Sequence, residues 1–155
     1  MGNIYSGSCL EVVKTKDLKA IKDLIFHQDI VKELVFNDYD DIDEKLERRK
    51  VIFYLFKIDN KNVGFAAFLD MQHLFKADEC YLVDVGFLKE FRGKFAYKLA
   101  KIALDKFMLE VFPKGLFALI DIKNKKSLFF SLKTGFEILS KDDKYYFLEA
   151  KTWEV

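Results

Sequence analysis

Apolar residues recur along this chain at two spacings, and the spacing separates helices from strands. Where they return every three or four positions, the pattern predicts amphipathic helices, at residues 16–26, 29–36, 37–50, 94–111 and 126–133. Dense runs of β-branched and aromatic residues predict strands, at residues 8–14, 51–58, 63–71, 79–87, 115–122 and 144–148. Because the two kinds of element alternate, we expect an α/β (α+β) fold with about six strands in a mixed sheet.

Composition narrows the class of protein. The chain is 51% hydrophobic and has 17 phenylalanines, which suffices for one packed core, so we expect a single domain over residues 1–155. Its formal net charge of +1 predicts no strong attraction to nucleic acid or to acidic membranes. No apolar run reaches the length of a membrane span. Cys9 and Cys80 lie far apart without metal-ligand spacing, so we expect no disulfide, no metal site and a reducing, cytoplasmic location.

An Arg-Gly pair opens the longest predicted helix. Arginine occurs only at positions 48, 49 and 92, and Arg92 and Gly93 stand where the strand at 79–87 gives way to that helix. Exposed amides at a helix N-terminus, next to guanidinium and ammonium groups, favour a bound phosphate. An ordinary helix start, with Arg92 paired to Glu90, is the alternative.

Two motifs resemble those of a known family. The first is VGFLKEFRGK at residues 85–94, which is similar to the strand, loop and R/Q-x-x-G-x-G/A phosphate turn of the GNAT acyl-CoA N-acyltransferases. The second is NKKSLFFSLKTGFE at residues 124–137, which resembles the Asn, the short helix and the Gly-Phe-Glu of the same family. The order of the predicted elements also matches, so the resemblance extends from about Cys9 to Ala150.

The resemblance implies a fold and a cosubstrate. The fold is a mixed, mostly antiparallel sheet flanked by helices, in which the strand at 79–87 splays from the strand at 115–122. The cosubstrate is acetyl-CoA, whose pantetheine arm pairs with the backbone of Val85, Gly86 and Phe87. Its pyrophosphate takes the free amides of the helix start. The implied cofactor-binding residues at this turn are Arg92, Gly93, Lys94, Phe95, Ala96 and Tyr97, and the second motif adds Asn124 as a further cofactor-binding residue.

The chain departs from the family pattern at two places. The phosphate turn of the family has glycines where this chain has Phe95 and Tyr97, and glycine lets the backbone approach a phosphate closely. The family tyrosine that often protonates the leaving thiolate falls, seven residues after Asn124, on Ser131. Serine is a weak general acid but can relay a proton through water, so Ser131 is a catalytic candidate. The alternative proton donors are Tyr97, Tyr145 and Tyr146.

The implied reaction also needs a base, because only a deprotonated amine attacks a thioester. Asp84 and Glu79 lie on the strand at 79–87, and His73 precedes it. Asp84 is the stronger candidate, since desolvation in its apolar surroundings would make its carboxylate a stronger base. The alternatives are a hydrogen-bonded strand residue for Asp84 and a solvated loop residue for His73.

The N-terminal half is where the resemblance places acceptor choice. Residues 27–30 and 37–41 make an acidic rim, which would favour a cationic amine such as a polyamine-like molecule or a protein lysine. A solvated connection between helices is the alternative. The expected partner is an amine acceptor, either a small molecule or a protein lysine or N-terminus. Neither nucleic acid nor a membrane is expected, and a homodimer is left open.

Two functions of different classes follow. The first is an acetyl-CoA-dependent N-acetyltransferase that acylates an amine by direct transfer. The second is a non-catalytic GNAT-fold binding or assembly module, which the replaced glycines and tyrosine favour. Phe75 or Trp153 would supply its apolar contact. The turn at residues 92–96 also resembles that of GNAT-like proteins of phages and prophages, some of which have roles in phage assembly.

Overall fold

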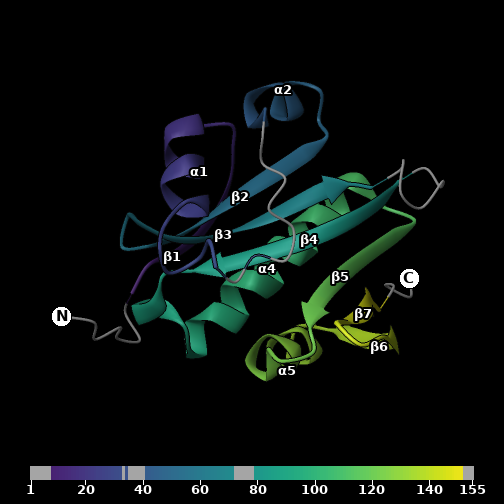
Figure 1. Cartoon of the computed structure of the whole chain (residues 1–155). Helices are drawn as coiled ribbons and strands as arrows, with labels where there is room; N and C mark the ends of the chain where they lie inside the picture. Colours follow the sequence, from purple (N-terminus) through teal and green to yellow (C-terminus); the bar gives the residue numbers. More distant parts are fainter. Residues whose placement is uncertain (1–7, 33, 35–40, 72–78, 152–155) are drawn as a thin grey trace.

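One sheet organises the molecule. The computed structural model describes residues 8–32, 34, 41–71 and 79–151. The strands in these ranges are β1 (Leu10–Thr15), β2 (Val51–Ile58), β3 (Lys61–Asp70), β4 (Cys80–Phe87), β5 (Gly115–Asp121), β6 (Phe136–Lys141) and β7 (Tyr145–Ala150). They lie in the order β1-β2-β3-β4-β5-β7-β6 (Figure 1). Neighbouring strands are antiparallel except β4 and β5, which are parallel, so the predicted mixed and mostly antiparallel sheet is confirmed.

Helices cover both faces of this sheet. They are α1 (Leu18–Ile25), α2 (Ile42–Glu47), the 3₁₀ turn η1 (Lys89–Phe91), α4 (Lys94–Val111) and α5 (Lys125–Lys133). Figure 1 shows α1 and α2 on one face and α4 on the other. Of the helices described, none combines the length and the apolar composition that a membrane crossing requires.

Alternation along the strands divides the apolar side chains between two cores. In β4, Leu82 belongs to the core beside α1 and α2, whereas Val83 and Phe87 belong to the core beside α4 and α5. In the second core, Phe68 of β3 stacks on Phe107 of α4 with ring centroids 3.9 Å apart. Because Asp84 follows the same alternation as Leu82, its side chain lies on the α1–α2 side of the sheet.

Two predicted elements differ from the structure. The helix predicted at 29–36 is absent from its described residues, where the amides of Ile30 and Val31 both donate to His27 O, at 3.0 and 2.9 Å, and close a single turn. The prediction of about six strands missed β6. In this edge strand only Phe136 is buried, and a register shift breaks the alternation that a strand prediction needs. By contrast, β2 and α4 have the predicted bounds.

Candidate active site

The central pair of strands separates after a short paired segment. The ladder between β4 and β5 consists of Cys80↔Gly115, Tyr81↔Leu116 and Leu82↔Phe117. Beyond it, no further pair joins the two strands in the described part of the chain, and Figure 1 shows β5 diverging from β4. In the described part of the chain, the backbone of β4 from residue 83 to residue 87 therefore pairs with no strand on that side, as the splay implied by the resemblance requires.

A cavity of about 690 Å³ occupies the region between the end of β4, the start of α4 and α5. Eight of the residues that the motifs predicted to bind acetyl-CoA line this cavity. Its lining consists of Ile30, Leu34, Val85, Gly86, Phe87, Lys89, Arg92, Gly93, Ala96, Tyr97, Asn124, Lys126, Ser127, Phe129 and Phe130. We call this space the outer cavity. Two motifs that lie about 30 residues apart in the sequence thus meet around one space.

A smaller cavity of about 80 Å³ adjoins the outer one, since Val85, Asn124 and Phe130 line both. We call it the inner chamber. Two of the predicted catalytic residues, Asp84 and Ser131, line it. It is polar for its size, because its other polar lining residues are Asp121, Asn124, Ser127 and Thr134.

Charge is distributed unequally between the two spaces. Among the described residues, the charged ones that line the outer cavity are the cations Lys89, Arg92 and Lys126. Those of the inner chamber are the carboxylates Asp84 and Asp121. Asp84 is 8% exposed, whereas Asp121 is exposed at the end of β5. An anionic ligand is therefore favoured at the outer cavity, and a cationic group at the inner chamber.

Arg92 holds the turn after α1 against the end of β4. Its Nε donates to Phe87 O at 3.1 Å, and its Nη2 donates to the backbone carbonyl of Asp29. The Asp29 carboxylate in turn accepts from the backbone N–H of Lys89 at 3.0 Å. The alternative partner considered from the sequence, Glu90, lies 3.4 Å from Lys61 Nζ. Part of the donor capacity of Arg92 therefore fixes the protein itself.

The first turn of α4 presents backbone donors. Gly93 is its N-cap, and no side-chain hydrogen bond caps the helix. The Ala96 amide donates to Gly93 O at 3.0 Å, while the earlier amides of a helix have no acceptor within it. A Cβ at Gly93 would meet no atom within 4 Å, so the space in front of these amides is open. Such a helix start is a site for a phosphate group.

Asn124 joins the cavities to the start of α5. Its Oδ1 accepts from the Ser127 amide at 3.1 Å and caps the helix. Asn124 and Ser127 line both spaces. The capping bond therefore fixes the Asn124 side chain relative to Ser127, and both residues border the two cavities.

Comparison with known proteins identifies the family. A family model described as "Acetyltransferase (GNAT) family" matches residues 18–136, which is most of the chain. The protein belongs to the GNAT family. This membership supports acyltransferase activity. No curated protein sequence matches the chain at a significant level.

Solved structures of N-acetyltransferases share the fold. The spermidine N-acetyltransferase of Vibrio cholerae, in complex with CoA and spermine, is 16% identical, with 94% of each chain covered and a TM-score of 0.64. The Campylobacter jejuni N-acetyltransferase PseH, in complex with acetyl coenzyme A, is 14% identical, with 94% of this chain and 100% of that chain covered and a TM-score of 0.67. A GNAT-family acetyltransferase from Streptococcus pneumoniae is 13% identical, with 91% and 98% covered and a TM-score of 0.69. At these identities the likeness shows the fold alone.

In this GNAT protein, Phe95 and Tyr97 stand where the phosphate turn of the family pattern has glycines. Tyr97 stacks on Phe130 of α5, with ring centroids 4.8 Å apart, and Lys133 Nζ lies 4.9 Å from the Tyr97 centroid. Tyr97 thus forms part of the cavity wall. Phe95 is half-buried and is not among the lining residues found in the described chain. The side chain of Lys94 lies outside what the structure describes.

Gly86 is required by packing inside the GNAT fold. A Cβ at this position would lie 2.8 Å from Ile30 Cγ2 and 2.9 Å from Phe65 Cε1. The close approach comes from the protein itself, because the turn after α1 packs directly on β4.

Several predicted residues lie away from the two spaces. Glu79 is exposed at the paired end of β4, 3.9 Å from Lys114 Nζ, and the strand length separates it from the cleft, so the structure does not bring it to the site. Tyr146 Oη accepts from Lys125 Nζ at 2.7 Å, which lowers the pKa of this tyrosine. Neither Tyr145 nor Tyr146 lines the two spaces. His73, Phe75, Trp153 and residues 37–40 of the acidic rim lie outside the described residues.

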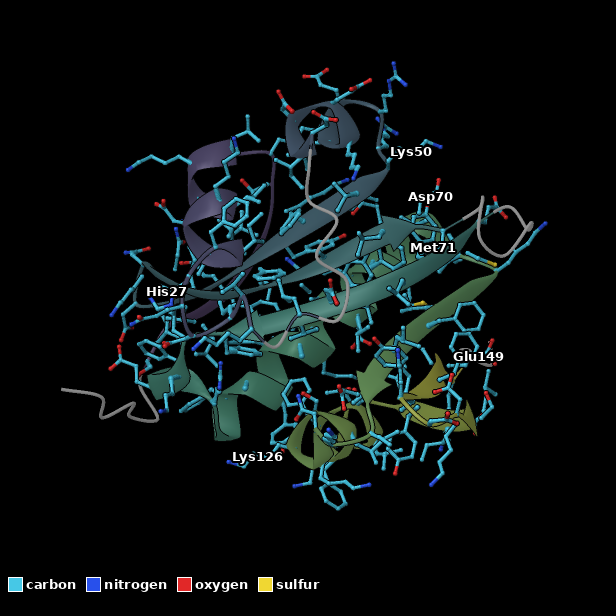
Figure 2. The ribbon with its side chains drawn as sticks, viewed as in Figure 1. His27, Lys50, Asp70, Met71, Lys126 and Glu149 are labelled. Carbon is cyan, nitrogen blue, oxygen red and sulfur yellow. The ribbon has the colours of Figure 1, made fainter. Side chains whose placement is uncertain are left out.

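Other lining residues were not predicted from the sequence. They include Ile30, Leu34, Lys89, Lys126, Ser127, Phe129, Phe130, Asp121 and Thr134. For those on α5 a signal was available, because Ser127 and Ser131 lie one helical turn apart and share a face. Figure 2 shows Lys126 on the side of α5 that faces the start of α4. Ile30 and Leu34 had no such signal, because only tertiary packing brings them to β4.

Proposed function

We propose that this GNAT protein transfers the acetyl group of acetyl-CoA directly to a primary amine. The observation that carries the proposal is the outer cavity. It joins the unpaired edge of β4 to the open N-terminus of α4 and continues into a chamber with a buried carboxylate. A pantetheine arm fits the strand edge, and a pyrophosphate fits the helix start.

The residues present suit each part of the cosubstrate. The backbone of Val85, Gly86 and Phe87 lines the outer cavity and can pair with the amides of pantetheine. The first amides of α4 and the cations Arg92 and Lys126 suit the phosphates. The carbonyl of the thioester would then lie near the inner chamber, where β4 amides can stabilise the oxyanion that forms.

Asp84 is proposed as the base. It is 8% exposed, lines the inner chamber and lies on the α1–α2 side of the sheet. It takes the proton from the acceptor ammonium, directly or through water. The free amine then attacks the thioester carbon, an N–C bond forms and the C–S bond breaks. Ser131 lines the same chamber and can relay a proton through water to the thiolate, which leaves as CoA.

Direct transfer is favoured because neither cysteine lines the two spaces. Cys9 is exposed, and Cys80 is buried at the paired end of β4. Within the described chain no thiol therefore stands ready to carry an acyl group. The carboxylates of the inner chamber favour a cationic acceptor, which is either a polyamine-like molecule or a protein lysine or N-terminus.

Binding and turnover test the proposal separately. We expect acetyl-CoA at millimolar concentration to raise the melting temperature, because a ligand that binds only the folded state stabilises it. In a broad panel of amines, we expect CoA release with at least one acceptor. Asp84→Asn should lower the rate roughly 100-fold or more while acetyl-CoA still raises the melting temperature.

The alternative, a non-catalytic module, predicts a different result. Under it no amine in the panel is acylated, even where acetyl-CoA binds. An unchanged melting temperature at saturating acetyl-CoA would contradict the proposal at its first step. Full activity of the Asp84→Asn variant would show that Asp84 is not the base, and the proposal that acetyl-CoA is the cosubstrate would stand.

A further inference from the structure

Phe129 is an exposed aromatic residue at the rim of the outer cavity. It lies on α5, and 60% of its surface is exposed although it lines the cavity. An exposed phenyl ring leaves apolar surface in water that burial would stabilise. By contrast, the next residue, Phe130, lines the same cavity and is half-buried.

The other rings of the outer cavity are already packed on one another. Phe130 is stacked on Tyr97 at 4.8 Å and meets Phe87 edge-on at 6.1 Å. Lys133 Nζ also lies 4.9 Å from the centroid of Tyr97. Within the described part of the chain, no such ring contact involves Phe129. Among the four aromatic rings that the described residues contribute to the lining, Phe129 is thus the one with a face available to a ligand.

Cations lie along the path to this ring. Lys89 and Arg92 line the cavity beside the start of α4, and Lys126 lines it one helical turn before Phe129. Lys126 is exposed, so its ammonium can reach a ligand at the rim. Together they indicate a ligand with phosphates in its middle and a flat, apolar-faced group at its outer end.

We propose that Phe129 is the stacking platform for the adenine base of acyl-CoA, with Lys126 pairing with the nucleotide phosphates. This inference rests on the proposed function, because it assigns the outer end of the same cosubstrate. When the pyrophosphate lies at the amides of α4, the adenosine is the part that continues outward to α5. Base stacking on an aromatic side chain does not depend on hydrogen-bonded readout, so one exposed ring suffices.

Titration calorimetry with CoA tests the platform. We expect Phe129→Ala to weaken CoA binding roughly five- to 150-fold, the range for losing one base–aromatic stack. Phe129→Trp should bind CoA at least as tightly as the natural protein. The matched control is Phe26→Ala, because Phe26 is 61% exposed at the C-cap of α1 and lines neither space, and the Kd of this variant for CoA should be unchanged.

A fluorescent analogue reports on the base itself. Ethenoadenine CoA is quenched when its base stacks on an aromatic ring, so its fluorescence should fall on binding to the natural protein. At saturation, the Phe129→Ala variant should relieve this quenching, whereas the Phe26→Ala variant should not. Phosphopantetheine has no base, and its affinity should be the same for Phe129→Ala and the natural protein.

The outcomes separate this inference from the proposed function. If the natural protein binds CoA and Phe129→Ala binds it equally tightly, the platform is refuted and the acetyltransferase proposal stands. Equal losses for CoA and phosphopantetheine would also refute it, because the ring would then support the cavity instead of the base. If the natural protein binds no CoA, both proposals fail together.

Discussion

Arg92 and Asp29 are separated by 63 residues and are joined at the rim of the outer cavity. The Arg92 guanidinium donates to the Asp29 carbonyl and also to Phe87 O, and the Asp29 carboxylate accepts from the Lys89 amide. The turn after α1 carries Ile30, which packs beside Gly86 of β4. These hydrogen bonds therefore join residues 87–92, which carry Lys89 and Arg92, to the turn after α1, which borders the cavity through Ile30.

Replacing Arg92 should loosen this turn. Arg92→Lys keeps the charge but loses the planar fork that can reach two carbonyls at once. We expect the amides of residues 27–31 to exchange with solvent about fivefold to tenfold faster, the effect of losing one hydrogen bond of roughly 1 kcal/mol. Exchange followed by mass spectrometry measures this. Arg48→Lys is the control, because Arg48 is an exposed partner of Glu44, and identical exchange at residues 27–31 in both variants would contradict the interpretation.

Gly86→Ala should destabilise the protein. The added methyl would lie 2.8 Å from Ile30 Cγ2 and 2.9 Å from Phe65 Cε1, inside a packed core. Overpacking of this kind costs about 1–3 kcal/mol. Urea denaturation without ligand should show a lower midpoint with an unchanged slope. A midpoint equal to that of the natural protein would mean that the turn after α1 yields without cost.

Gly93→Ser should separate binding from stability. A Cβ at this position meets no atom within 4 Å, and serine is a favoured N-cap, so the free energy of unfolding should stay equal or rise by a few tenths of a kcal/mol. The new hydroxyl would accept from the amides proposed to bind the pyrophosphate. We therefore expect weaker acetyl-CoA binding, measured by calorimetry. Unchanged affinity would place the phosphates elsewhere.

Tyr54 should make stability depend on alkaline pH. Its burial, and then its hydrogen bond to Glu110 Oε2 at 3.0 Å, raise the pKa of Tyr54 well above the ordinary value. In the unfolded chain a tyrosine ionises at about pH 10, whereas the folded state keeps the proton. Its stabilising contribution is therefore present below about pH 10 and is lost as the pH rises further.

Tyr54→Phe tests this sign. At neutral pH the variant should be about 1 kcal/mol less stable, because it lacks the hydrogen bond to Glu110. Between about pH 9.5 and 11 the gap to the natural protein should shrink, since only the natural protein loses the Tyr54 contribution. Denaturation curves across this range give the gap directly. A constant gap would show that Tyr54 ionises in the folded state at its ordinary pKa, and a widening gap would show that folding lowers this pKa; either result would contradict the prediction.

The motifs predicted much of the site but not its boundary. Residues 85–87, 92–93 and 96–97 and Asn124 line one space, because each motif fixes a local strand end or helix start. Glu79 lies on the same strand as Asp84 but at its paired end, and the sequence held no sign of where β4 and β5 part. Where the strands separate depends on packing against helices on both faces.

The sequence by itself determined the order and type of most elements, because periodicity, caps and turn residues act within a few positions along the chain. It also determined the chemistry of the two motifs. Only the tertiary structure decided that Phe129 and Lys126 share a cavity with Gly93, and that Ile30 closes it against Gly86. Those distances join segments far apart in sequence, and they are set by sheet pairing and core packing, which no local pattern records.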